Sequence, residues 1–165
     1  MLAVASVLRW MSGSSWGEAG LGGKSVFRDT LLGACAGTAA FLIVAVTAGT
    51  SAIGELAIVR GNGEALVLVG LLTVAFAAAG EMVFRGFIMT RVAAATDSWA
   101  MGNIVAAIAF GIAIGGDDIG AVIGLSVAGL GYGLLYLAAS RRLALAIATH
   151  ATFGLGAVLA AYLQL

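Results

Sequence analysis

The sequence predicts an all-α protein, a multi-pass transmembrane helix bundle of about five spans preceded by an N-terminal stub. The 165 residues are 62% hydrophobic and only 10% charged, whereas soluble domains carry about 25% charged residues. The mean hydropathy is +1.11, and the apolar residues gather in runs close to the roughly 20 residues that cross a bilayer as a helix. This composition could not cover a soluble surface, so we expect one integral membrane domain.

The same composition excludes several kinds of site. The formal net charge is zero, so no nucleic-acid partner is expected. A single cysteine and a single histidine are too few for a zinc site, which takes three or four such ligands, and we expect no metal and no cofactor. The 25 glycines are spread through the apolar runs and no proline occurs, a pattern that favours close helix packing in lipid.

The expected elements follow in chain order. Residues 1–29 are expected to form an N-terminal stub and a polar connector, and residues 30–165 the membrane-embedded domain. The apolar stub 2–12 is too short to span a bilayer, and Trp10 and Trp16 are candidate interface anchors. The spans are expected at residues 30–50, 64–92, 99–114, 119–139 and 143–164.

Small residues and turn residues predict how these spans pack and where they begin. Two glycine pairs have the small-xxx-small spacing that lets helices approach closely, namely Gly33 with Gly37 and Gly129 with Gly133. Asp97 and Ser98 are expected to cap the third span. Residues 115–118, Gly-Gly-Asp-Asp, predict a tight, solvated turn before the fourth span.

Basic residues predict the orientation. The loops on one side hold only Arg60, whereas the N-terminal segment and the loops after the second and fourth spans hold Arg9, Lys24, Arg28, Arg91, Arg141 and Arg142. Because cytoplasmic loops carry an excess of Lys and Arg, this asymmetry predicts a cytoplasmic N terminus and an external C terminus.

The second span contains the stretch Gly80-Glu81-Met82-Val83-Phe84-Arg85-Gly86. A charged side chain at the centre of a membrane helix costs roughly 2.5–3.5 kcal/mol. Glu81 and Arg85 are four residues apart, so they share a helix face and can pair. Two interpretations stay open for the pair: it belongs to a functional site, or it only fixes helix packing.

The single histidine, His150, is expected at a similar depth. Glu81 precedes Arg91 by ten residues and His150 follows Arg142 by eight, which gives roughly 15 Å and 12 Å from the cytoplasmic ends of their helices at 1.5 Å per residue. A carboxylate and an imidazole in one cavity can do acid–base work on a water or a peptide. The alternative is a core histidine bonded to a backbone carbonyl.

These residues resemble those of a known family, the CAAX protease and bacteriocin-processing (CPBP, or Abi) intramembrane endopeptidases. The family has three membrane-embedded motifs, Glu-Glu-x-x-x-Arg (often continued as Phe-Arg-Gly), Phe-x-x-x-His and His-x-x-x-Asn. Residues 81–86 match the second half of the first motif, and residues 110–114 and 150–154 lie where the second and third belong. The resemblance extends from about residue 16 to the C-terminal end.

The resemblance implies a glutamate- and histidine-dependent membrane endopeptidase. Glu81 and His150 match catalytic positions of the family, and Phe84, Arg85 and Phe110 match structural motif positions. The resemblance further implies contact with membrane lipid, a lipidated or hydrophobic peptide as the substrate, and a bacterial plasma membrane as the location.

Three positions depart from the family pattern. The family's general base is replaced by Gly80, its water-holding histidine by Ile114, and its oxyanion-stabilising asparagine by Gly154. Glycine and isoleucine cannot accept a proton or orient water, and each lost acid–base role lowers the rate by about 10²–10⁴. Glu81 lies about 100° around the helix from Gly80, so it replaces the lost base only if the helix rotates. Asp117 and Asp118 follow Ile114 closely, but a solvated turn explains them better.

The sequence therefore predicts a family member whose activity is impaired or lost. One alternative is a non-catalytic scaffold that binds a membrane peptide or a partner helix. A third hypothesis, from a different class, is a small transporter subunit in which Glu81, Arg85 and His150 form a polar path; few further polar residues are available for such a path.

Overall fold

The part of the chain that the structure describes is helical, as predicted. The computed structural model describes residues 21–22, 25–48 and 59–163, and no strand occurs among them. Its helices are α2 Val26–Ala48, α3 Gly63–Glu81, the π-helix η3 Met82–Met89, α4 Thr90–Thr96, α5 Trp99–Gly115, α6 Ile119–Ala138 and α7 Leu143–Leu163. The predicted stub 2–12 and the candidate anchors Trp10 and Trp16 lie outside the described residues.

Four helical stretches in the described ranges are long and apolar enough to cross a membrane, Val26–Thr47, Gly63–Thr96, Ile119–Ala138 and Leu143–Leu163. They correspond to the first, second, fourth and fifth expected spans. The third expected span is α5, which has 17 residues. At 1.5 Å per residue its length is about 26 Å, less than the hydrocarbon core of about 30 Å. The chain is thus an integral membrane protein, whose described residues provide four candidate spans and one shorter apolar helix.

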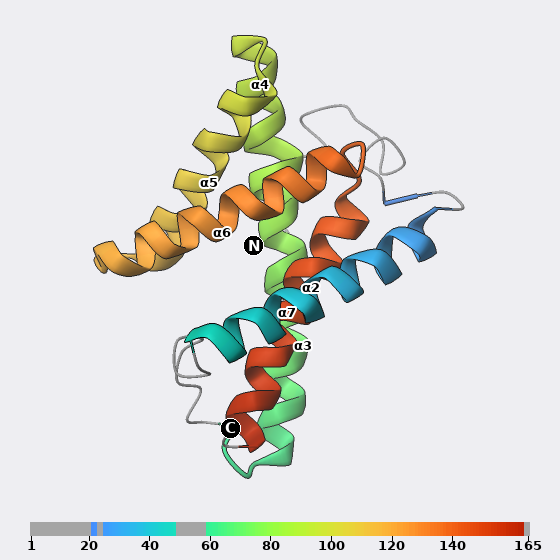
Figure 1. Cartoon of the computed structure of the whole chain (residues 1–165), viewed down its shortest axis with the longest axis vertical. Coiled ribbons are helices and arrows are strands. Elements are labelled where there is room, and N and C mark those ends of the chain that lie inside the picture. Colours follow the sequence, from blue (N-terminus) through green and yellow to red (C-terminus); the bar gives the residue numbers. More distant parts are fainter. Residues whose placement is uncertain (1–20, 23–24, 49–58, 164–165) are drawn as a thin grey trace.

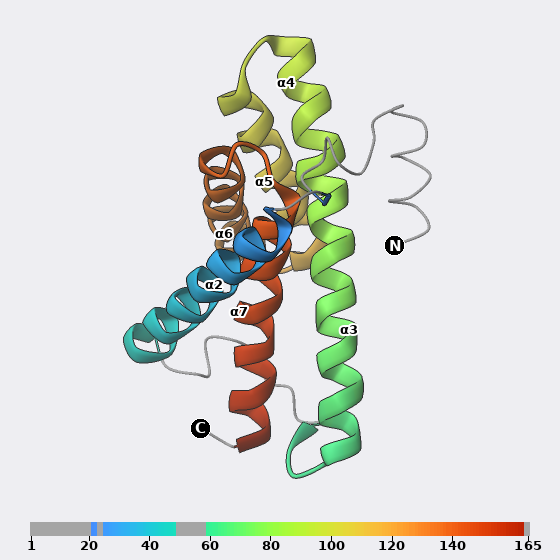
Figure 2. The ribbon, with the colours of Figure 1, turned by 90° about the vertical axis from the view of Figure 1, so that its right-hand side faces the viewer.

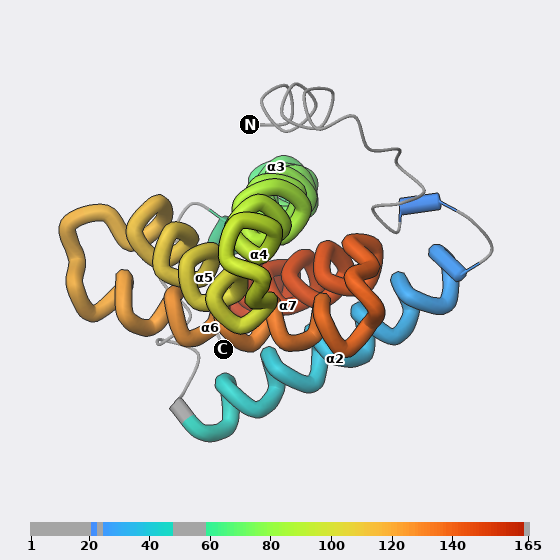
Figure 3. The backbone as a smooth tube through the Cα atoms, turned by 90° about the horizontal axis from the view of Figure 1, so that it is seen from above, coloured from blue at the N-terminus to red at the C-terminus, as the bar shows by residue number. Residues whose placement is uncertain are grey.

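The helix α7 occupies the centre of the bundle. It contacts α2, α3, α6 and η3. Figure 1 shows α3, η3 and α4 as one continuous rod with α7 beside α3, and Figure 2 shows α2 crossing α7 obliquely. Viewed from above in Figure 3, α5 lies to the left of this rod, and α2 runs from the right-hand side, below α7, to the lower left. Side chains of α7 can therefore meet side chains from the rod and from α6.

Both predicted glycine pairs lie at close helix contacts. A Cβ atom at Gly33 or Gly37 would collide with backbone atoms of α7, and one at Gly129 would lie 3.1 Å from the Cα of Ala107 on α5. A Cβ at Gly133, also on α6, would collide with the Asn103 side chain of α5. The absence of side chains thus allows α2 to pack on α7 and α6 to pack on α5.

Substitution of Gly37 by alanine should lower the unfolding temperature of the detergent-solubilised protein. The added methyl group would collide with the Thr149 carbonyl oxygen and with Thr152 Oγ1, and overpacking of this kind costs about 1–3 kcal/mol. The matched control is Gly124→Ala on α6, where an added Cβ meets nothing within 4 Å. Equal unfolding temperatures for the two variants would contradict a tight α2–α7 contact.

The helix boundaries at the two predicted turns have side-chain caps. Ser98 Oγ accepts the Met101 N–H at 3.2 Å and caps α5, whereas Asp97 ends α4 in a left-handed conformation with φ 51° instead of capping α5. Residues 115–118 form the predicted turn, in which Asp117 and Asp118 are exposed. The Asp118 carboxylate accepts the Ala121 N–H at 3.1 Å and caps α6.

Several basic residues gather at one end of the bundle. Arg142 contacts the buried carboxylate of Asp29 at 3.1 Å and Arg28 contacts it at 3.2 Å. The Arg141 guanidinium lies 4.8 Å from the ring centroid of Trp99. These contacts bring the start of α2, the start of α5 and the α6–α7 connection together, as the charge asymmetry requires of segments on one side of a membrane.

Candidate active site

Glu81 and Arg85 form the predicted buried pair. Arg85 Nη1 donates to Glu81 Oε1 at 3.1 Å, and the two side chains are 1% and 0% exposed. Arg85 Nη2 also donates to the carbonyl oxygen of Gly129 on α6 at 2.7 Å. The guanidinium therefore joins the rod to α6 while it neutralises the carboxylate.

The helix after Glu81 is π-helical, a feature that we did not predict from the sequence. Short π segments with i→i+5 hydrogen bonds are rare and frequently lie at functional sites. At its C-terminal end, the Thr90 hydroxyl donates to the carbonyl oxygens of Gly86 and Phe87, at 2.9 Å in each case. Gly80 and Glu81 both precede the π segment in α3, so the segment does not rotate Glu81 into the position of Gly80.

His150 meets Glu81 in the bundle, as the depth count predicted. His150 Nδ1 lies 2.9 Å from Glu81 Oε1, and the His150 side chain is 22% exposed. In the neutral imidazole, an Nδ1–H that donates to the carboxylate leaves the Nε2 lone pair available. The alternative interpretation, a core histidine bonded to a backbone carbonyl, is wrong, because the partner of the ring is the Glu81 carboxylate.

Three aromatic rings surround the polar group. The Phe110 ring is edge-on to those of Phe84 and His150, with centroid distances of 5.3 Å and 5.7 Å. The Tyr132 ring is stacked on His150, with centroids 4.9 Å apart and an interplanar angle of 16°. The structure thus brings together the predicted motif residues Phe84, Arg85 and Phe110, and it adds Tyr132, which we did not predict.

Two polar atoms of the ion pair lack partners within the described ranges. Glu81 Oε2 and Arg85 Nε are buried and make no hydrogen bond there. Buried polar atoms are nearly always hydrogen-bonded in native proteins, and the exceptions call for an explanation such as a catalytic role. The pair therefore retains hydrogen-bonding capacity that packing alone does not use.

The three positions that depart from the motifs add no polar side chain to this group. Gly80 is buried, and a Cβ atom there would meet nothing within 4 Å outside its own stretch of helix. Ile114 is 51% exposed near the C-terminal end of α5. A Cβ atom at Gly154 would lie 2.6 Å from Thr73 Cγ2 on α3. A Cβ atom thus fits at position 80 without a clash, whereas at position 154 it does not.

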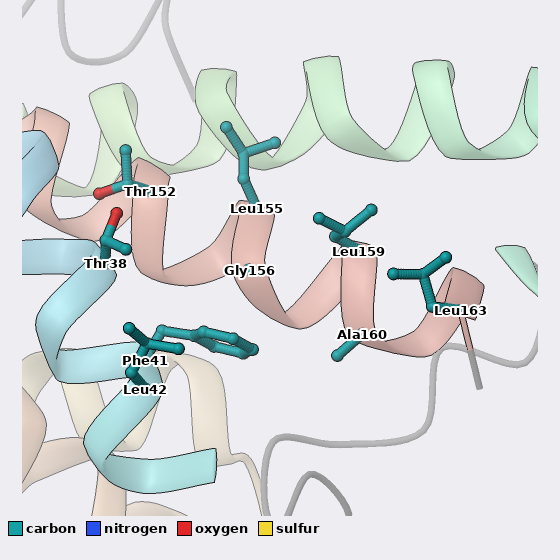
Figure 4. A pocket seen from close by; sticks show the side chains of 9 residues that line it. All are labelled: Thr38, Phe41, Leu42, Thr152, Leu155, Gly156, Leu159, Ala160 and Leu163. Atoms are coloured by element: carbon teal, nitrogen blue, oxygen red, sulfur yellow. The ribbon is translucent and has the colours of Figure 1, made fainter. Parts of the chain in front are cut away.

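An apolar pocket of about 390 Å³ lies between α2 and α7, away from the Glu81–His150 contact. Figure 4 shows Thr38, Phe41 and Leu42 of α2 opposite the α7 residues that complete its lining. None of the lining residues is charged, and neither Glu81 nor His150 is among them. The pocket is therefore separate from the candidate active site.

The comparisons with known proteins agree with the motif residues. A family model described as type II CAAX prenyl endopeptidase Rce1-like matches residues 62–156, more than half of the 165 residues. The match includes Glu81, Arg85, Phe110 and His150. No curated protein and no solved structure matches the chain.

Proposed function

The chain belongs to the Rce1-like family of type II CAAX prenyl endopeptidases. We therefore propose that it binds a lipidated or hydrophobic peptide at His150 within the membrane. We further propose that it hydrolyses this peptide slowly or not at all. The chain keeps the second glutamate of the family's first motif and the histidine of the third. It lacks the other catalytic side chains, so binding is better supported than turnover.

The burial of the Glu81 carboxylate is the observation that carries this proposal. Glu81 Oε1 is already bound by Arg85 and by His150, Oε2 is buried, and the whole residue is 0% exposed. A general base must come within hydrogen-bond reach of the water that it deprotonates. Glu81 therefore serves better to orient His150 than to activate water, and Gly80 supplies no replacement.

His150 has the chemistry of a peptide-binding group. Its Nδ1 is engaged by Glu81, and the side chain is 22% exposed, so the opposite ring edge is the one free to meet a ligand. The neutral Nε2 accepts a peptide N–H, and the protonated ring donates to a peptide carbonyl oxygen. The same geometry favours a second candidate, slow hydrolysis in which Glu81 orients His150 and His150 is itself the base.

The test compares the wild-type protein with His150→Ala, using two farnesylated peptides. One carries a photo-crosslinker and reports binding, and the other is a quenched fluorescent substrate and reports cleavage. We expect crosslinking that His150→Ala strongly reduces, and background-level cleavage by both proteins. Robust turnover that His150→Ala abolishes would favour the second candidate, and equal crosslinking of both proteins would refute binding at His150.

We also propose that the N terminus is cytoplasmic, as the distribution of basic residues indicates. The test introduces single cysteines at Ser51 and Asp117 in a Cys35→Ser background, because Cys35 is exposed. Both cysteines should react with a membrane-impermeant reagent added from outside cells. If both cysteines are protected from the reagent added outside cells and are labelled in inverted vesicles, the N terminus lies outside and the proposed orientation is wrong.

A further inference from the structure

Tyr132 of α6 contacts groups from two other helices, α7 and η3, at the candidate site. Its ring is stacked on His150 of α7 at a centroid distance of 4.9 Å. The guanidinium carbon of Arg85, in η3, lies 5.6 Å from the centroid of the same ring. Tyr132 is 9% exposed and projects from α6 one residue before Gly133, where α6 packs closely on α5. The tyrosine ring is thus held by the bundle and in turn contacts both partners of Glu81.

The contacts of Tyr132 are made by its ring and not by its hydroxyl. Within the described ranges the hydroxyl makes no hydrogen bond, whereas the ring contacts both the imidazole and the guanidinium. We propose that Tyr132 is a positioning residue for His150, whose ring keeps Nδ1 directed at Glu81 and leaves Nε2 available. This inference rests on the proposed function, since His150 is the group assigned there to peptide binding.

The geometry explains how a ring can hold the imidazole. Rotation about the Cβ–Cγ bond of His150 sweeps the imidazole out of its plane, and a nearly parallel ring on its face opposes this movement. The Phe110 ring, at 85° to the imidazole, restricts it from another direction. While Nδ1 stays 2.9 Å from Glu81 Oε1, only the Nδ1–H tautomer of the neutral ring donates to the carboxylate. Loss of the stacked ring should therefore allow both orientations and both tautomers.

Nitrogen NMR of the imidazole tests this inference without any substrate. His150 is the only histidine of the chain, so protein labelled with ¹⁵N-histidine and purified on a histidine-free tag reports this ring alone. Above neutral pH, the wild-type protein should show well-separated resonances for a protonated Nδ1 and an unprotonated Nε2. Tyr132→Phe should keep this separation, and Tyr132→Leu should shift the two resonances towards each other as the tautomers exchange.

The matched control is Tyr136→Leu, one turn further along α6. Tyr136 is 3% exposed and packs in the core with Met89 and Leu143, so this variant should lower stability and leave the His150 resonances unchanged. Wild-type resonances in Tyr132→Leu would overturn the inference. So would averaged resonances in Tyr132→Phe, since the hydroxyl and not the ring would then hold His150. If Tyr132→Leu does not fold, Tyr132→Met is measured in its place with the same expectation.

This measurement is independent of the peptide assays. Averaged resonances in Tyr132→Leu together with no crosslinked peptide would retain the positioning role and refute peptide binding at His150. Unchanged resonances together with His150-dependent crosslinking would refute the positioning role and retain peptide binding.

Discussion

Replacement of Arg85 by alanine should lower the free energy of unfolding by about 3–5 kcal/mol and sharply reduce the yield of folded protein. Arg85 donates to Glu81 at 3.1 Å and to the Gly129 carbonyl oxygen at 2.7 Å. Without the guanidinium, a carboxylate that is 0% exposed loses its cationic partner inside the bundle. Denaturant unfolding of the purified protein in detergent would measure the loss.

Two further variants test whether the buried charge causes this effect. Arg91 lies on the same rod but is exposed, with its guanidinium 5.6 Å from the Phe87 ring centroid, so Arg91→Ala should change stability by no more than about 0.5 kcal/mol. The double variant Glu81→Gln with Arg85→Met should be more stable than Arg85→Ala, because it removes both charges. Wild-type stability of Arg85→Ala would show that the pair does not stabilise the fold.

Hydropathy and spacing predicted the parts of this protein in which lipid restricts the choice of residues. The spans follow from the length of the apolar runs, because a bilayer requires about 20 such residues. The Glu81–Arg85 contact follows from the i,i+4 spacing and from the cost of an unpaired charge in lipid. The contact between His150 and Glu81 followed from equal depth only because α7 lies beside α3, which the sequence did not indicate.

Other features depend on tertiary contacts and leave little trace in the sequence. Tyr132 is one aromatic residue in an apolar helix, and nothing in its spacing distinguishes it from a lipid-facing side chain. The π-helix at Met82–Met89 corresponds to no periodic pattern in the sequence. The departure at Gly154 appeared in the sequence only as a lost asparagine, whereas the structure shows a steric reason for glycine there.

That steric reason affects how the motif residues that the family resemblance implies can be introduced into this chain. The Thr73 hydroxyl donates to the Val69 carbonyl oxygen at 2.8 Å, and this bond fixes the Cγ2 methyl group that a Cβ at position 154 would meet at 2.6 Å. An asparagine at 154 therefore does not fit beside threonine 73. Serine at position 73 keeps the hydroxyl and removes the methyl group, so Thr73→Ser should make room for the larger side chain.

A variant combining Gly80→Glu, Ile114→His, Gly154→Asn and Thr73→Ser should cleave the quenched farnesylated peptide about 10²-fold faster than the wild-type protein, or more. Each restored acid–base role is worth about 10²–10⁴ in rate, and an asparagine N–H would add a donor for the developing oxyanion. A Cβ atom at position 80 would meet nothing within 4 Å outside its own stretch of helix. Initial rates measured on folded protein, isolated by size-exclusion chromatography, would give the comparison.

Two controls connect any gain in rate to the site. Addition of His150→Ala should return turnover to the wild-type level, because His150 is the imidazole that the retained motif supplies. Omission of Thr73→Ser should lower the unfolding temperature, because the Cγ2 clash at position 154 then remains. If the folded four-residue variant cleaves the peptide only at the background rate, we would examine position 114 first. Ile114 is 51% exposed, and a histidine there would have to turn towards His150. Background turnover would then mean that the four substitutions do not complete a peptidase site, and the crosslinking assay would decide whether the protein binds the peptide.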